Sequence, residues 1–298
     1  LGPDLRPVTV SAPARALLPS GGGGAVAEEF VDLGPVPLFG IRCGPEAGGH
    51  PPIAVFLTAG VLHRSGPARM WTDLARRWAS RGVPSVRVDV SGTGHSGTRP
   101  GQPRLVVLAP EALDDLATLA AALGGPDGRD LVYVGLSSGG ALAVEAALQQ
   151  RPLGICALNP SITSRPPEAT VPGGRRRGYR RTLFRSLRRR HRRIAGHLAW
   201  AAGQVLVHRA PVGPLVLGAR RGSSVLTVVT EDEAEPLRGN AFWGALAWPA
   251  RRAGRYRLCV IPGRDHSLYL RATRVRAMEA MTEWVVALHD RGASSGAS

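Results

Sequence analysis

The chain has 298 residues, of which 44% are hydrophobic and 20% charged, a composition typical of a globular protein with a sizeable core. No apolar run reaches the about 18 residues that cross a bilayer, and no secretory signal pattern opens the chain, so we expect no transmembrane segment. The three cysteines lie far apart without metal-ligand spacing. We interpret them as reduced thiols of a cytoplasmic protein.

The positive charge is unusual because all 38 basic residues are arginine, with a net charge of +16. Arginine in place of lysine throughout, with abundant Ala, Gly and Pro, is explained by a codon bias toward G and C. Clustering is not explained in this way, since residues 175–193 hold eleven arginines and no acid. Without these eleven charges the net charge falls to +5, so the excess is local.

In chain order, residues 1–25 are rich in Pro, Gly and Ala and indicate a loose arm. We predict strands over 28–33, 36–42, 53–58, 83–90, 131–135, 154–158, 224–230 and 256–261, and helices over 68–81, 110–123, 138–150, 236–253 and 272–289. This alternation predicts a mostly parallel α/β sheet with helices on both faces, built from residues 26–160 and 223–298. Residues 161–222 interrupt the alternation, and we expect them to form an inserted, arginine-rich helical cap.

The most informative stretch begins at Leu131, where an apolar run with strand composition leads into Gly135-Leu136-Ser137-Ser138-Gly139 and then into an alanine-rich segment. A strand, G-x-S-x-G and a helix in this order predict a nucleophile elbow with Ser137 at its tip. Side chains at Gly135 and Gly139 would collide with the neighbouring strand and helix. The backbone N–H of Ser138, at the helix N-terminus, can point at a developing oxyanion.

A serine nucleophile needs a base, and the base needs an orienting acid. The predicted strand 256–261 leads into a loop that carries His266, which is the candidate base. The predicted strand 224–230 leads into three consecutive acids, Glu231, Asp232 and Glu233, which supply the candidate orienting acid.

With these residues in view, the chain resembles an α/β-hydrolase with a cap domain over roughly residues 28–160 and 223–290. The most specific matches are Gly135–Gly139, Arg87–Ser96 and Gly263–Ser267, and Ala59–Pro67 resembles serine-aminopeptidase-like and exosortase-associated hydrolases. The order serine, acid, histidine is the order of this family. The family's spacing favours Asp232 when counted back from Pro236 and Glu233 when counted forward from the strand. We prefer Asp232.

The resemblance also implies that the loop after the strand 53–58 supplies a second oxyanion donor, which on this chain is Gly60 or Val61. Ala59 stands where the family usually has histidine. His63, beside this loop, is a candidate for substrate contact, with a purely structural role as the alternative. No cluster of His, Cys or carboxylates has metal-ligand spacing, so we predict neither a metal nor another cofactor.

Within the expected cap, the apolar residues from Leu183 to Val205 fall on one helical face, and most arginines take the other faces. One interpretation is a solvent-exposed helix surface whose arginines reflect only the codon bias. A second is a collar that attracts an anionic acyl donor, such as an acidic carrier protein or coenzyme A. A third is a helix on a membrane surface or unspecific nucleic-acid binding; few aromatics argue against specific nucleic-acid recognition.

Together these features predict an enzyme that cleaves an ester or thioester of a small-molecule acyl substrate through an acyl-enzyme on Ser137. Two alternatives stay open. One is an acyltransferase that uses the same triad with a carrier-bound or coenzyme A donor in a biosynthetic pathway. The other is a binding protein that keeps the fold without catalysis.

Overall fold

The computed structural model describes residues 16–18, 25–46, 52–102, 104–107, 111–125, 127–160, 212–238 and 241–295. Its strands are β1 (Ala16–Leu18), β2 (Val26–Leu33), β3 (Leu38–Pro45), β4 (Ile53–Leu57), β5 (Ser85–Val88), β6 (Leu131–Leu136), β7 (Gly154–Leu158), β8 (Ser224–Thr230) and β9 (Tyr256–Ile261). Its helices are the short 3₁₀ turn η1 (Pro67–Arg69), α1 (Met70–Ala79), α2 (Glu111–Leu123), α3 (Ser138–Gln149), α6 (Val212–Arg220), α7 (Glu231–Arg238), α8 (Ala241–Arg252) and α9 (Arg271–Ser295).

One nine-stranded sheet organises these elements, in the order β1-β2-β3-β5-β4-β6-β7-β8-β9. The pairs from β1 to β5 are antiparallel, and all pairs from β5 through β4 to β9 are parallel. The carboxyl ends of the parallel strands therefore meet along one edge of the sheet. The segments that follow β4, β6, β7, β8 and β9 all start at this edge, which is where ligands bind in open α/β sheets.

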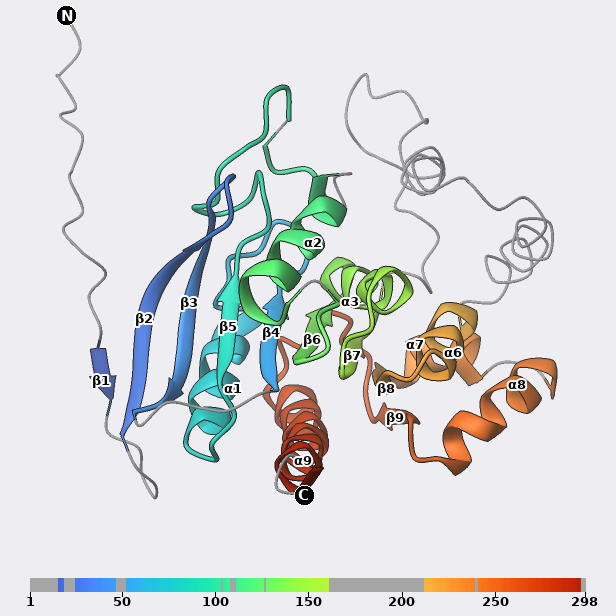
Figure 1. Cartoon of the computed structure of the whole chain (residues 1–298). Coiled ribbons are helices and arrows are strands. Elements are labelled where there is room, and N and C mark those ends of the chain that lie inside the picture. Colours follow the sequence, from blue (N-terminus) through green and yellow to red (C-terminus); the bar gives the residue numbers. More distant parts are fainter. Residues whose placement is uncertain are drawn as a thin grey trace, which may run out of the picture.

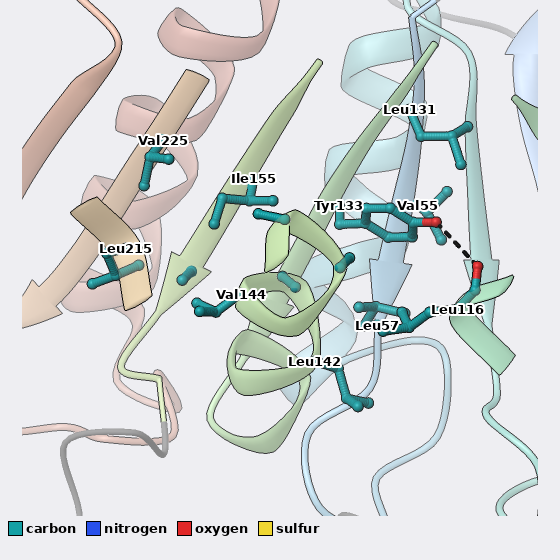
Figure 2. Packing of buried hydrophobic residues seen from close by; sticks show 14 of the residues in the cluster. Val55, Leu57, Leu116, Leu131, Tyr133, Leu142, Val144, Ile155, Leu215 and Val225 are labelled. Atoms are coloured by element: carbon teal, nitrogen blue, oxygen red, sulfur yellow. Dashed lines mark hydrogen bonds between the residues drawn. The ribbon is translucent and has the colours of Figure 1, made fainter. Parts of the chain in front are cut away.

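Helices cover both faces of the sheet (Figure 1). Helices α1 and α9 pack on one face, where Trp71, Trp78 and Met281 are fully buried, while α2, α3, α6 and α8 cover the other. Strands buried on both sides explain the continuous apolar runs of β4 and β6. Figure 2 shows the second face, where Tyr133 packs among aliphatic side chains and its hydroxyl points at the carbonyl of Leu116. The predicted mostly parallel α/β sheet with helices on both faces is confirmed.

Besides shifts of a few residues at the ends of elements, three differences from the sequence prediction change the arrangement. Part of the expected loose arm, residues 16–18, forms β1 on the edge of the sheet. The one helix predicted over 236–253 is two helices, because α7 starts directly after β8 at Glu231. The sequence predicts the residues of helix α6 to be part of the cap. In the structure α6 packs on α3 and α8 and buries Leu215 in the core, so it is one of the helices that cover the sheet. The rest of the predicted cap, 161–211, and of the arm lies outside the described residues.

All three cysteines lie in strands as free thiols. Burial raises the pKa of the Cys43 thiol to about 12 and raises the pKa of Cys156 and Cys259 as well. The thiolate, which is the reactive form, is therefore suppressed at neutral pH. Among the helices of the described segments, none combines the length and the apolarity required to span a membrane.

Candidate active site

Ser137 lies at the tip of a sharp turn between β6 and α3. Its backbone has φ 54° and ψ −116°, a conformation that residues other than glycine rarely adopt. The turn is held from both sides, since the Ser137 N–H donates to the Leu158 carbonyl at 2.9 Å and its carbonyl accepts from the Ala141 N–H at 3.0 Å. This is the geometry of the predicted elbow, with the serine hydroxyl raised above the carboxyl edge of the sheet.

The glycines around Ser137 are required by close backbone contacts. A Cβ at Gly135 would collide with the backbone of Gly139, and a Cβ at Gly139 would lie 2.6 Å from the carbonyl oxygens of Leu57 and Thr58. Real Cβ atoms do not approach backbone so closely, and backbone packed between β4, β6 and α3 cannot give way. The motif is therefore fixed by steric contacts of the first turn of α3 with β6 and with the end of β4.

His266 and Glu233 complete a chain of hydrogen bonds that starts at Ser137. The Nε2 atom of His266 is 2.9 Å from the Ser137 Oγ, and its Nδ1 is 2.8 Å from the Glu233 Oε1. The histidine side chain is 37% exposed and the glutamate 19% exposed. A carboxylate can only accept, so Nδ1 carries the proton and Nε2 is left free to accept the serine hydroxyl proton.

Of the two candidate acids, the geometry favours Glu233 over Asp232, the reverse of the preference drawn from the family's spacing. Both residues lie in the first turn of α7, and Asp232 points to solvent. Because α7 begins at Glu231 without a connecting loop, the helical turn decides which acid faces the histidine. The third acid, Glu231, accepts from the Gly263 N–H at 3.3 Å, next to the end of β9.

Two residues that the sequence analysis passed over hold the loop of His266. The Asp265 carboxylate accepts the N–H groups of Tyr269 at 3.1 Å and Leu270 at 2.7 Å, which closes the loop onto itself. Asn159, at the end of β7, donates from its side chain to the His266 carbonyl at 2.9 Å. A polar residue directly after an apolar strand, at the edge that carries the site, is the signal that marks Asn159.

The predicted oxyanion donors, Ser138 and either Gly60 or Val61, lie close together. The Gly60 N–H donates to the Ser138 hydroxyl at 2.6 Å, so this donor is already engaged. The N–H groups of Ser138 and Val61 have no hydrogen-bond partner within the described part of the chain. The geometry thus favours Ser138 and Val61 as the pair of free donors, with the Ser138 side chain fixing the loop that carries Val61.

His63 belongs to a cluster with Arg64, Asp89 and His95 at the same edge of the sheet. The Arg64 Nη1 lies 2.7 Å from the His63 Nε2, 2.7 Å from the Asp89 Oδ2 and 2.8 Å from the His95 Nδ1. Burial and the charge of Arg64 lower the pKa of His63. The cluster ties the loop after β4 to the loop after β5, because the Arg64 N–H also donates to Asp89 at 2.8 Å.

The same cluster bears on the prediction that the chain binds no metal. The possible ligand atoms of His63, Asp89 and His95 lie within 4.8 Å of one another, a grouping that the sequence analysis missed since it joins two loops. These atoms converge on the guanidinium of Arg64, which is a cation already. A metal ion would have to displace a buried arginine from its aspartate, so we assign the cluster to anchoring the loops.

Comparison with known proteins agrees with this fold. A family model described as "Alpha/beta hydrolase family" matches residues 54–278. No curated protein sequence is significantly similar to the chain. Among solved structures, Est1E from Butyrivibrio proteoclasticus with bound ferulic acid has 16% identity and a TM-score of 0.54, and the match covers 87% of this chain and 98% of the Est1E chain. Proline iminopeptidase from Mycobacterium smegmatis has 17% identity and a TM-score of 0.50, covering 89% and 99%.

At these identities the two structures demonstrate a shared fold and nothing finer. The family model is more telling because it runs from β4 through the elbow and the acids to α9, and so includes every residue of the candidate site. The chain therefore belongs to the alpha/beta hydrolase family and is an enzyme of that family.

Proposed function

We propose that the protein is a serine hydrolase that cleaves a carboxylic ester or thioester through an acyl-enzyme on Ser137. The observation that carries this proposal is the continuous hydrogen-bonded chain from Glu233 through His266 to Ser137, with contacts of 2.8 and 2.9 Å. A hydroxyl, an imidazole and a carboxylate that are hydrogen-bonded in this order form the arrangement that activates serine for acyl transfer.

In the first half of the reaction, the Ser137 Oγ attacks the acyl carbon and its proton passes to the His266 Nε2. Glu233 stabilises the imidazolium by accepting the Nδ1–H bond. Negative charge on the former carbonyl oxygen is stabilised by the N–H groups of Ser138 and Val61, which need no reorganisation because the Ser138–Gly60 bond fixes the loop. The imidazolium then protonates the leaving alcohol or thiol as the tetrahedral intermediate collapses.

In the second half, water takes the place of the leaving group. His266 removes a proton from this water, which attacks the acyl carbon, and the Ser137 Oγ leaves with the proton that His266 returns. The side chain of His63 can meet the substrate only from its exposed side, since its Nε2 is engaged with Arg64. We therefore assign His63 to the wall of the site rather than to the chemistry.

Hydrolysis of short-chain nitrophenyl esters tests this function. We expect Ser137→Ala and His266→Ala each to lower kcat by at least about 10³-fold, by analogy with other serine triads. The matched control is Ser80→Ala, because Ser80 caps the C-terminal end of α1 and its exposed hydroxyl donates to the Arg77 carbonyl, and it should leave kcat within about twofold of the wild type. Full activity in Ser137→Ala would overturn the proposal.

A further inference from the structure

The end of β7 touches all three segments that meet in the site. The Leu158 carbonyl accepts the N–H of Ser137 at 2.9 Å. The next residue, Asn159, accepts the N–H of Thr230 with its Oδ1 at 2.9 Å, three residues before Glu233. Its Nδ2 donates to the carbonyl of His266 at 2.9 Å. Two consecutive residues therefore hold the backbone of the serine, acid and histidine segments.

The Asn159 amide is matched to both of its neighbours. The Thr230 N–H can only donate and the His266 carbonyl can only accept, so the oxygen and the nitrogen of the amide have one possible assignment. Aspartate could replace the acceptor but not the donor, and alanine could replace neither. The Asn159 N–H is also engaged, donating to the Val228 carbonyl at 2.9 Å.

Asn159 is held in a conformation that its surroundings impose. It is only 1% exposed, and its φ of 35° lies in the left-handed region, where asparagine is tolerated better than most residues. Such a residue persists where its contacts outweigh the local strain. Here those contacts are the two bonds that cross from the end of β7 to the end of β8 and to the loop of His266.

We propose that Asn159 is a positioning residue that sets the distances from the His266 ring to Ser137 and Glu233. It acts through the backbone of the histidine loop and does not touch the substrate. Two further bonds, between Glu231 and Gly263, join the ends of β8 and β9, but they lie before the loop turns toward His266. Two other side chains hold the later part of the loop: Asp265 bonds residues 269 and 270, and Arg274 in α9 donates to the carbonyls of Leu268 and Tyr269. Among the described residues, only the Asn159 side chain bonds the backbone of His266 itself.

This inference rests on the proposed function for its kinetic consequence but not for its structural one. Removing the bond leaves the His266 loop free to move. A displacement of about 1 Å of a catalytic group costs on the order of a hundredfold in rate. Binding of the substrate should change little, since no substrate contact is removed.

Two variants and one control test the role of Asn159. Asn159→Gly keeps the backbone conformation without strain and removes the amide, while Asn159→Asp keeps the acceptor for Thr230 and removes only the donor to His266. The control is Gln150→Ala, which removes another buried amide that bonds the Leu116 carbonyl at 2.8 Å. Gln150 follows α3 at the end opposite Ser137, about 18 Å away along its 12 residues.

We expect both Asn159 variants to lower kcat about a hundredfold with KM within about threefold, and Gln150→Ala to lower the unfolding temperature without changing kcat. The downfield proton resonance of the His266 Nδ1–H bond, assigned through its loss in His266→Ala, should vanish in both Asn159 variants and persist in Gln150→Ala. This resonance reports geometry even if nitrophenyl esters are not substrates. An unchanged resonance in Asn159→Asp, or an Asp variant with full kcat, would overturn the inference.

Discussion

The two halves of the site are held by different forces. On the elbow side, backbone packs against backbone, and glycines at 135 and 139 leave no room for a side chain. On the acid and histidine side, side chains hold the loops, through Asn159 and Asp265. The contact between Gly135 and Gly139 joins residues within one short motif, whereas the Asn159 side chain bonds a residue 107 positions away. The nucleophile is therefore fixed locally and its partners only by the finished fold.

The largest expected effect distinguishes Glu233 from Asp232 as the acid that orients His266. Glu233→Gln should lower kcat by about 10³- to 10⁴-fold, since the neutral amide no longer stabilises the imidazolium and can favour the wrong tautomer. Asp232→Asn, which changes the neighbouring exposed acid in the same way, is the matched control and should stay within about twofold. Steady-state kinetics with a nitrophenyl ester decides between them, and a reversed pattern would restore Asp232 as the acid.

The next effect concerns the backbone-held half. Gly135→Ala should lower the free energy of unfolding by at least about 3 kcal/mol, because the new methyl group meets the backbone of Gly139. Gly44→Ala is a control in strand β3, where the added Cβ would make an ordinary contact of 3.6 Å with Pro84, and it should cost less than about 1 kcal/mol. Urea unfolding measures both. Equal stabilities would show that the elbow can relax.

A smaller effect is expected where the two halves meet, at the oxyanion loop. Ser138→Ala removes the acceptor of the Gly60 N–H and should lower kcat about tenfold, or about 1.4 kcal/mol, by loosening the loop that carries Val61. Ser138→Thr keeps the hydroxyl and should recover most of that loss. If the threonine variant is no better than the alanine variant, the bond to Gly60 does not position the donor.

The smallest expected effect concerns the Glu28 carboxylate, which lies in the antiparallel half of the sheet, away from the site. Burial alone raises the pKa of the Glu28 carboxyl, but the hydrogen bond from Arg76 and the charge of Arg87 outweigh it, so this pKa lies below its ordinary value. The folded state thus holds the charged form, and this stabilisation is present above the unfolded pKa of about 4.5 and lost as the pH falls through the folded pKa. Glu28→Gln should cost about 1 kcal/mol at pH 7 and less at pH 3. Unfolding curves at both pH values check this.

The comparison also explains how far the sequence alone could lead. The elbow at Ser137 and the loop of His266 follow local patterns, and the structure places both at the expected strand ends. The choice between Asp232 and Glu233 depends on where α7 starts, which the run of three acids does not reveal. A polar residue directly after β7 marks Asn159 in the sequence, but its bonds to Thr230 and His266, like the Arg64–Asp89 pair, join segments that meet only in the folded chain.

The most direct test of the account is the mass of the intact protein after rapid quenching with an ester whose acyl group leaves slowly. We predict one acyl group on the wild type, located on the peptide that contains Ser137, and far slower acylation of both His266→Ala and Glu233→Gln. The absence of an acyl adduct during turnover, or an adduct on another residue, would contradict the claim that Ser137, His266 and Glu233 act as one unit.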